Sequence, residues 1–359
     1  MKKLDRYIIF RLFVITIFLV AVLIFIYVVI DFSQRSDDFT NHGATIVQVI
    51  EIYYLNYIPE IIRLVTPVAV LLATLLLTGQ MSDRFEIVAI KAAGISLYRL
   101  AIPYLIFGFF ACIVVSYFDG FIVPKSNAIR MKFEQKYLGD QSEKIDRSKV
   151  YRQESPHSIM LVNYFDPKEK VGYKVQFFRF KDGNIVQTLN ASRIEWQPKS
   201  KKWKLVRGFE RDYSSDGYKL VQFDTRDTTL NVMPLDLART SSDVSQLTYP
   251  EIVQYIGSLE RSGATGLDLP KVQFYSRLSY PFSIIVGILI GLSMAAVKTR
   301  GGLWVNVAYG LLICFVYLAL MKISEPFGYS GEMSPLVAAL LPHAIFFSTG
   351  IAMLITARK

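Results

Sequence analysis

The side chains best suited to binding chemistry lie in a short polar segment, residues 80–94, between two runs apolar enough to cross a membrane. Ser82 and Asp83 are good helix N-cap residues, and Gly94 is a natural stop. The sequence therefore predicts a short helix over about 82–94. This helix is too polar to span a membrane and too apolar to be a plain loop, so it needs a partner surface.

The predicted helix is amphipathic. Phe85, Val88 and Ala92 fall on one face by their three-to-four-residue spacing. That face has two possible partners, the lipid headgroups or a docking site on a cytosolic protein. Glu86 lies in the same helix. Its carboxylate is either a solvated surface charge or one half of a charge-assisted bond to an arginine of a partner.

Basic residues near the ends of predicted spans are the second set of candidates. They are Arg35, Arg63, Lys125, Arg130 and Lys132. An arginine suits a phosphate group because its planar guanidinium offers two parallel donors. Arg35 and Arg63 are therefore candidates for contacts to the phosphates of an anionic lipid, and the three residues after the third span are further candidates. The alternative is that the arginines only extend to ordinary headgroups.

Several kinds of catalytic chemistry have no support in the sequence. His42, His157 and His343 are scattered without the spacing of metal ligands. There is no Ser-His-Asp or Cys-His arrangement, and no Gly-x-x-x-x-Gly-Lys-Ser/Thr motif to hold nucleotide phosphates. We therefore expect no catalytic residue, metal or cofactor. His343 follows Pro342 inside a predicted span, where it is either a functional ionisable group or a packing residue.

The composition indicates a membrane protein. Of 359 residues, 52% are hydrophobic, the mean hydropathy is +0.33, and the formal net charge is +10. Many basic residues border the apolar runs, which favours basic cytoplasmic edges over nucleic-acid binding. Cys112 and Cys314 both lie inside apolar runs, so we expect packing residues and no disulfide. The first apolar run lacks a small-residue cleavage site, so no cleavable signal peptide is expected.

Six apolar runs are long enough to span a bilayer. They lie at about 8–30, 61–78, 99–123, 275–297, 302–321 and 335–356. Within the first, residues 12–30 are an uncharged stretch of 19 residues, enough to cross a core of roughly 30 Å. Pro67 falls inside the second span, where neighbouring helices must satisfy the freed backbone group.

The basic residues predict the orientation. The segments 1–11, 79–100, 298–300 and 357–359 hold eleven Lys or Arg, whereas the short segments 31–60 and 322–334 hold two. The basic side stays in the cytoplasm, so both termini are predicted there. The region between the third and fourth spans is then outside, which in a Gram-negative cell means the periplasm.

That outside region has the pattern of an antiparallel β domain, placed at 124–246. Its alternating runs are 171–180, 192–196, 202–206 and 218–223, and its turn signals are 181–184, 197–200 and 214–217. A sandwich or a half-open barrel would fit. The apolar members expected on the inward face are Val175, Phe177, Ile194, Trp196, Leu205 and Phe223. This face either handles acyl chains or fills a closed core.

A short amphipathic helix over 247–263 follows the β domain, with Pro250 at its start. The predicted organisation is a first transmembrane half at 1–123, the β domain at 124–246, and a linker helix with the second transmembrane half at 247–359. The fold class is therefore an α-helical membrane protein of six spans, three on each side of an inserted all-β domain.

This layout and its motifs resemble the LptF/LptG permease family, also called YjgP/YjgQ, over essentially the whole chain. The motifs are Leu4-Asp-Arg-Tyr7, the segment 82–94, Tyr275-Ser-Arg-Leu-Ser-Tyr-Pro281 and Leu340-Leu-Pro342. The first of them and the region 310–342 are closer to the LptG branch. The resemblance implies that the β domain is a periplasmic jellyroll.

The resemblance also implies a function in the bacterial inner membrane. Such permeases pair with a second LptF/LptG-type permease above a dimer of a cytosolic LptB-like ABC ATPase. ATP hydrolysis drives extraction of lipopolysaccharide, which passes to LptC-like and LptA-like periplasmic jellyroll proteins. No nucleic acid takes part, and the contacts are otherwise with membrane lipids. The alternatives are a membrane-anchored scaffold or sensor whose β domain binds a periplasmic partner, and an exporter of another lipid.

The implied site residues form two groups. The residues expected to couple to the ATPase are Asp83, Arg84, Glu86, Val88, Lys91 and Gly94. The lipid-binding candidates are Arg35, Arg63, Lys125, Arg130, Lys132, Phe177 and Trp196. The chain departs from the family in one respect: Asp31 and Glu60 stand where the family commonly has basic residues, with Arg35 and Arg63 displaced from them.

Overall fold

The computed structural model describes residues 3–137, 150–166, 169–181, 183–198, 200–214, 217–237, 241–262, 267–296 and 302–357. The chain divides into two compact units. One is Met1–Gly139 with Lys271–Lys359, and the other is Asp140–Pro270. The predicted basic residues Lys298, Arg300, Arg358 and Lys359 lie outside the described residues.

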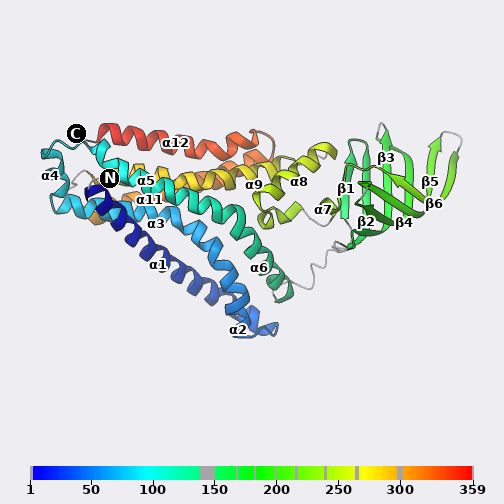
Figure 1. The fold of residues 1–359 in the computed structure, drawn as a ribbon, viewed down its shortest axis with the longest axis horizontal. Helices are drawn as coiled ribbons and strands as arrows, with labels where there is room; N and C mark the ends of the chain where they lie inside the picture. Colours follow the sequence, from blue (N-terminus) through cyan, green and yellow to red (C-terminus); the bar gives the residue numbers. More distant parts are fainter. Residues whose placement is uncertain are drawn as a thin grey trace. The chain divides into compact units, whose positions relative to one another are not determined.

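The first unit is a bundle of long helices (Figure 1). Its first half comprises α1 (Lys3–Asn41), α2 (Ile46–Gln48), η1 (Val49–Tyr54), α3 (Leu55–Asp83), α4 (Glu86–Ala92), α5 (Leu97–Tyr117), η2 (Phe118–Ile122) and α6 (Val123–Tyr137). Its second half comprises α9 (Asp268–Ser279), η5 (Tyr280–Phe282), α10 (Ser283–Ala295), α11 (Gly302–Tyr329) and α12 (Pro335–Thr356).

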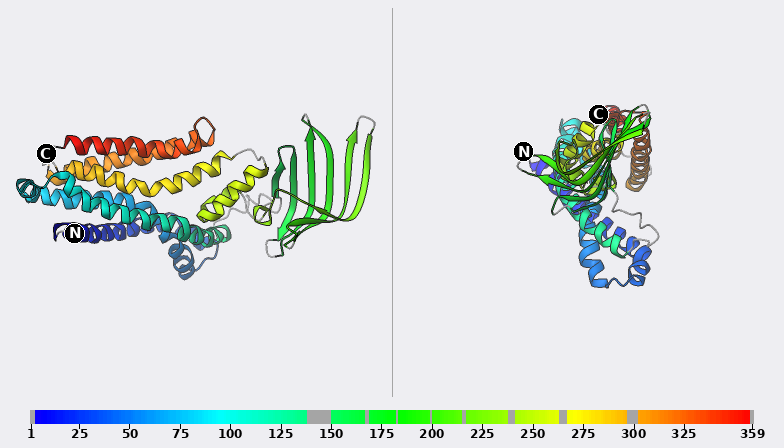
Figure 2. Two further views of the ribbon diagram at one scale, coloured as in Figure 1. Left: turned by 45° about the horizontal axis from the view of Figure 1, so that its top comes forward. Right: turned by 90° about the vertical axis from the view of Figure 1, so that its right-hand side faces the viewer.

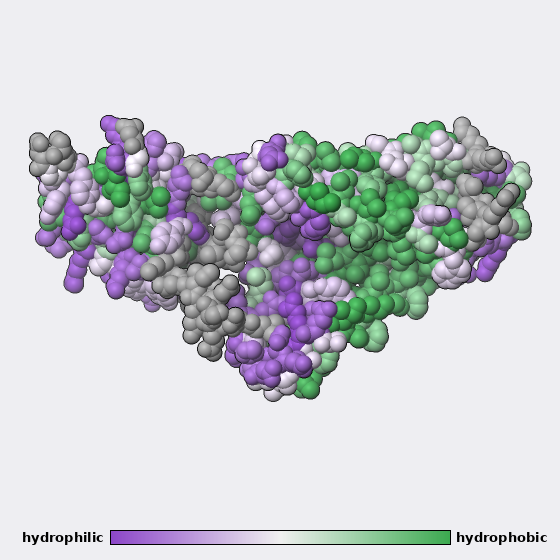
Figure 3. Space-filling model, turned by 180° about the vertical axis from the view of Figure 1, so that it is seen from behind, coloured by the Kyte–Doolittle hydropathy of each residue, from purple (hydrophilic) through white to green (hydrophobic). Residues whose placement is uncertain are grey.

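Six helical stretches of the described chain are long and apolar enough to cross a membrane, which confirms the predicted spans. Apolar side chains gather over these helices, and polar ones over the tip that carries α2 (Figure 3). The helices are longer than the apolar runs alone. The sequence predicted an end near residue 30 for the first helix, but α1 continues to Asn41. This extension packs through Phe39 against Tyr53 and Phe133, so aromatic contacts keep it helical after its hydropathy has fallen.

The segment after the third span differs from the sequence prediction. The sequence predicts that residues 124–137 belong to the β domain. In the structure they lie in α6, and the first described strand begins at Val150. The segment is too polar to read as a span, and its N-terminal Pro124 is compatible with a first helical turn. Burial of Phe133 within the aromatic cluster of α1 and η1 holds it in the helical unit.

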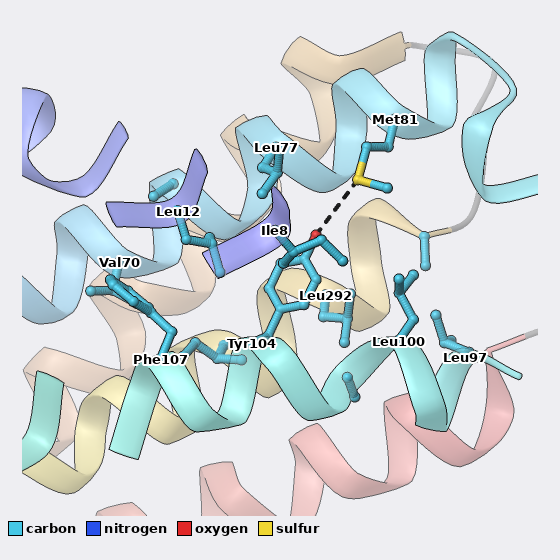
Figure 4. Close-up of a cluster of buried hydrophobic side chains, with 14 of the residues drawn as sticks. Ile8, Leu12, Val70, Leu77, Met81, Leu97, Leu100, Tyr104, Phe107 and Leu292 are labelled. Carbon is cyan, nitrogen blue, oxygen red and sulfur yellow. Dashed lines mark hydrogen bonds between the residues drawn. The ribbon is translucent and has the colours of Figure 1, made fainter. Parts of the chain in front are cut away.

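The core of the bundle lies where α1, α3, α5 and α10 meet (Figure 4). The fully or almost fully buried side chains there include Ile8, Leu12, Leu77, Met81, Tyr104 and Leu292. Of these six side chains, only that of Tyr104 has a hydroxyl group. This hydroxyl accepts a hydrogen bond from the Thr78 hydroxyl at 3.0 Å. Among the described spans, the stretch Asp268–Ala295, which ends in α10, lies deepest, with 78% of its most apolar residues buried. It approaches α3 closely because Gly291 leaves room for Thr74.

The proline inside the second span lies close to a hydrogen bond from a neighbouring element. Pro67 lies within α3, and it removes a backbone donor from the helix. In the turn before it, the Tyr280 hydroxyl from η5 donates to the carbonyl oxygen of Leu64 at 2.9 Å. A neighbouring element therefore supplies a donor to this stretch of α3. Cys112 and Cys314 are both free and half-buried.

The second unit contains one antiparallel sheet of six strands in sequence order (Figure 2). The strands are β1 (Val150–Ser155), β2 (Ser158–Asp166), β3 (Val171–Lys181), β4 (Asn184–Gln197), β5 (Lys202–Ser214) and β6 (Gly217–Thr228). The three predicted turn segments join β3 to β4, β4 to β5 and β5 to β6. β1 and β6 are the two edges, so the described sheet is an open, twisted meander rather than two stacked sheets.

The sheet buries the face that its alternation predicted. All six residues expected on the inward face belong to one apolar cluster with Met160, Val162 and Trp203. After the strands come α7 (Pro234–Leu237), η4 (Ser241–Gln246) and α8 (Tyr249–Ser262). The start of α8 agrees with the sequence, and Glu251 caps it by accepting hydrogen bonds from the backbone amide and hydroxyl of Thr248 at 2.9 and 2.8 Å.

Candidate functional site

The first candidate surface is α4, at the end of the bundle where α1 begins and α12 ends (Figure 1). The predicted N-cap is wrong. Ser82 and Asp83 are the last residues of α3, because Met81 and Ser82 are buried and the packing of α3 continues through them. The chain reverses direction at Phe85, whose φ of 61° is left-handed, and α4 begins at Glu86.

The predicted stop of the short helix is correct. Gly94 follows the helix with a φ of +78°, a conformation in which a side chain would be strained. The Gly94 amide donates to the carbonyl of Lys91 at 2.9 Å, and the Ile95 amide donates to that of Ile90 at 3.2 Å. These two bonds form a Schellman motif that satisfies the last carbonyls of α4.

The two faces of α4 have different environments. Ile87 is 2% exposed and belongs to the bundle core, with Ile90 packed beside it. Phe85 and Val88 are 58% and 59% exposed, and Ala92 is also exposed. The face predicted to need a partner is therefore presented outward on a helix whose opposite face is fixed. We call Phe85, Glu86, Val88 and Ala92 the α4 outer face.

Charged side chains flank the α4 outer face. Arg84 and Glu86 form an exposed ion pair with 3.9 Å between Nη1 and Oε1, which contributes little to stability. Both groups can therefore exchange this contact for one with a partner at small cost. Asp83 is exposed at the end of α3, and Lys91 lies in the last turn of α4. The predicted coupling residues thus lie on one short stretch at one end of the bundle.

The second candidate site is a row of alternating charges, which we call the ion-pair ladder. In order, its members are Asp31, Arg35, Glu134, Arg130, Glu60, Arg63, Asp119 and Arg277. They come from α1, α3, η2, α6 and α9. With four carboxylates and four guanidinium groups the ladder has no net formal charge. Because the ladder is neutral, it offers no excess positive charge that would bind a phosphate.

The tightest contacts of the ladder are at Glu60 and Asp119. Arg130 donates from Nη1 to Glu60 at 2.8 Å, and its guanidinium lies 4.1 Å from the centre of the Tyr57 ring. Asp119 is 1% exposed. Its carboxylate lies between Arg277, at 3.1 Å from Nε, and Arg63, at 3.6 Å from Nη1. This carboxylate joins the two transmembrane halves of the chain.

The other end of the ladder is stabilised by tyrosines. Asp31 is 7% exposed and accepts hydrogen bonds from the hydroxyls of Tyr53 and Tyr54 at 3.1 and 3.2 Å. Arg35 lies 3.2 Å from the same carboxylate and 3.5 Å from Glu134. Asp31 and Glu60, noted in the sequence as departures from the family, are thus both acceptors of the ladder, Asp31 buried and Glu60 half-buried.

The structure separates the five basic candidates into two groups. Arg35, Arg63 and Arg130 are engaged with carboxylates of the ladder. Lys125 and Lys132 are exposed on α6 and form no ion pair with a described carboxylate. The two lysines are therefore the better placed of the five to meet an external anion.

A third candidate lies in the β unit, on the apolar face of the sheet. Trp203 is fully buried on one part of this face. Its Nε1 donates a hydrogen bond to the carbonyl of Val232 at 2.7 Å, and the centre of its ring lies 5.1 Å from that of Trp196. Another part is open. A cavity of about 110 Å³ is lined there by four apolar residues, Phe177 and Leu205 among them, and by seven polar or charged residues, which include Arg179, Glu210 and Arg226. The face is thus part packed core and part cavity.

Comparison with known proteins agrees with these features. A family model described as "Lipopolysaccharide export system permease LptF/LptG" matches residues 6–356. The chain belongs to the LptF/LptG family. The resemblance predicted from the motifs is therefore confirmed, and so is the fold class of six spans with an inserted all-β domain.

Two relatives carry the name "Lipopolysaccharide export system permease protein LptG". The protein of Escherichia coli strain K12 is 22% identical over 358 residues, which covers 98% of this chain and 97% of its own. The protein of Haemophilus influenzae strain Rd is 20% identical over 292 residues, or 80% of each chain. These names agree with the predicted closeness to the LptG branch. As an LptF/LptG permease, the chain is a multi-pass membrane protein and a non-catalytic transporter subunit.

Sequence reasoning missed three members of the ladder in this LptF/LptG chain. Asp119 and Glu134 received no role, and Arg277 was noted only as part of a motif. A lone carboxylate at the end of an apolar run, as at Asp119, is a signal that could have been used, because such a group must find a buried partner. The partner itself could not have been chosen, since Arg277 lies 158 residues away.

His343 is placed as a packing residue. It is 2% exposed in α12, with its Nδ1 bonded to the Tyr317 hydroxyl of α11 and its Nε2 3.1 Å from the Ser279 hydroxyl of α9. Both ring nitrogens are therefore used between three helices of the LptF/LptG bundle. This arrangement favours the structural alternative that the sequence left open.

Proposed function

We propose that this LptF/LptG chain is the permease subunit of an ABC exporter that extracts lipopolysaccharide from the bacterial inner membrane and passes it to a periplasmic bridge. Both termini and α4 lie in the cytoplasm, and the β unit lies in the periplasm. The distribution of Lys and Arg supports this orientation. In the complex, a second LptF/LptG-type permease and a dimer of an LptB-like ATPase complete the pump, and LptC-like and LptA-like proteins receive the lipid.

The α4 outer face carries this proposal. The chain has no motif for nucleotide phosphates, so a pump built on it must take its energy from a separate ATPase. α4 offers exposed Phe85 and Val88 beside the Glu86 carboxylate, while Ile87 fixes the helix to the core. A rigidly held apolar helix face with one charge suits docking into a groove of a partner protein. Movement of the ATPase would then be transmitted to α3 and α5, which flank α4.

Co-purification tests the proposal against the scaffold alternative. The chain is extracted in a mild detergent, and the bound proteins are identified by mass spectrometry. An exporter subunit should retain an ABC ATPase and lose it when Phe85 and Val88 are changed to aspartate. A scaffold or sensor would retain periplasmic partners through its β unit but no ATPase, in the parent and the variant alike.

The exposed lysines of α6 give a prediction about the lipid. Lys125→Ala with Lys132→Ala should lower the lipopolysaccharide retained by the purified complex by about fivefold, or roughly 1 kcal/mol, because two free cations near the membrane edge are lost. Lys136→Ala, on the same helix, serves as the control. Equal retention in parent and variant would exclude the lysines from binding. Charge reversal at Arg63 is a poorer test, since it would place three carboxylates together with Glu60 and Asp119.

The cavity of the β unit gives a second prediction. A photocrosslinker at Phe177 should capture lipopolysaccharide in an ATP-dependent manner, because this side chain lines the cavity. The same crosslinker at Phe178 is the matched control, since adjacent strand residues point to opposite faces of the sheet. A crosslinker at Trp203 should capture no lipid, because that side chain is fully buried in the packed part. Lipid captured equally from positions 177 and 178 would contradict a role for the cavity.

A further inference from the structure

The helical unit contains an apolar groove that shares only Arg63 with the sites above. It lies between α1, α3 and α5 and has a volume of about 320 Å³. On α1 its lining runs from Phe13 to Ile24, and on α5 and the first residue of η2 it runs from Phe107 to Phe118. Each stretch advances eleven residues, or about 16 Å at 1.5 Å per residue. This length is about half of a bilayer core of roughly 30 Å, which is the depth of one leaflet.

The groove is open to the side. Phe13, Ile17 and Phe110 contribute to its lining and are 47%, 52% and 58% exposed. The hollow of about 320 Å³ extends over about 16 Å, so it is long and narrow, whereas a helix with its side chains is about 10–12 Å across. The hollow therefore does not enclose a transmembrane helix of a partner. It suits a single hydrocarbon chain.

One end of the groove is polar. Arg63 lines it there, next to Phe118 and the carboxylate of Asp119. The two terminal nitrogens of Arg63 face Asp119 and Glu60, but its Nε is buried and has no hydrogen-bond partner among the described residues. A buried donor of this kind requires an acceptor. The groove thus combines an apolar channel one leaflet deep with the unpartnered Arg63 Nε at its mouth, and among the described residues the Thr16 hydroxyl in its lining is also without a partner.

We propose that this groove holds one acyl chain of a glycerophospholipid, with an ester or phosphate oxygen of that lipid accepting a hydrogen bond from the Arg63 Nε. The ion-pair ladder is electrically neutral, so the mouth does not attract a headgroup of high negative charge. Two isolated donors and the width of one chain fit an ordinary membrane phospholipid better than a large, multiply charged glycolipid. The bound chain fills the space between α1 and α5 and keeps the two helices apart.

Photolabelling tests this site. The purified protein is reconstituted in nanodiscs that contain a phosphatidylglycerol with a diazirine on one acyl chain, and labelled peptides are mapped by mass spectrometry. We expect labels on residues 13–24 and 107–118 at a level that saturates near one lipid per protein. A parallel sample carries lipopolysaccharide labelled in the same way, and it should not label these peptides.

A pair of neighbouring substitutions provides the control. Ala21 lines the groove, whereas Val22 is exposed but is not part of its lining. Ala21→Trp should fill the groove and lower its labelling about fivefold, which corresponds to roughly 1 kcal/mol, and Val22→Trp should leave it unchanged. Equal labelling in the two variants would mean that the lipid is ordinary bilayer lipid. Labelling by lipopolysaccharide instead, or of a partner protein in the intact complex, would also overturn the proposal.

Discussion

Replacing Asp119 by alanine should lower the free energy of unfolding of the helical unit by about 3–5 kcal/mol. The carboxylate is 1% exposed and lies between Arg63 and Arg277. Its removal leaves two largely buried guanidinium groups, whose side chains are 16% and 11% exposed, without their shared partner. The cost of an uncompensated buried charge then exceeds whatever the ion pairs contribute by themselves. Thermal unfolding in detergent, followed by intrinsic fluorescence, measures the effect.

Two further variants make this prediction specific. Asp37→Ala removes an exposed carboxylate from the same half of the chain and should change the stability by less than about 0.5 kcal/mol. The triple variant Arg63→Met, Asp119→Leu and Arg277→Met removes all three charges together. It should be more stable than Asp119→Ala, because no charge of this trio is left unpaired. A triple variant less stable than the single one would show that Asp119 acts through its packing instead.

Val88→Glu should weaken binding of the ATPase by about 30-fold, equivalent to roughly 2 kcal/mol, while the protein still inserts and folds. Val88 is 59% exposed, so the change does not disturb the core. The new carboxylate would introduce an unpaired charge into an apolar interface. Glu86→Arg should also weaken binding, by loss of the bond to an arginine of the ATPase and by repulsion between like charges. Pull-down of the ATPase over a range of concentrations gives the affinity.

Controls for the coupling prediction lie on either side of α4. Ile87→Ala removes a buried side chain and should lower the free energy of unfolding by about 2–5 kcal/mol. Any loss of ATPase binding in this variant would therefore result from partial unfolding and not from a lost contact. Asp37→Arg changes a charge near the far end of α1, about 48 Å along that helix from Asp5, and should leave ATPase binding unchanged. Normal ATPase binding by Val88→Glu would remove the α4 outer face from the mechanism.

The sequence by itself determined the parts of this protein that depend on local pattern. Runs of apolar residues gave the spans, because backbone groups in a bilayer must be satisfied within a helix. Alternation gave the strands from β3 to β6 and the buried face that contains Val175 and Ile194, because side chains alternate across a strand. Gly94 marked the end of α4, since its positive φ is a local requirement.

The tertiary structure decided which residues meet. Arg63 and Arg277 are 214 residues apart in sequence, yet both reach Asp119, and no local pattern could select that partner. The same holds for α6, whose polar sequence is helical because Phe133 finds the aromatic cluster of α1 and η1. Packing also chose the face of α4 that is buried. Ile87 entered the core and left Phe85 and Val88 outside, because the direction of the chain after α3 is set by the turn at Phe85.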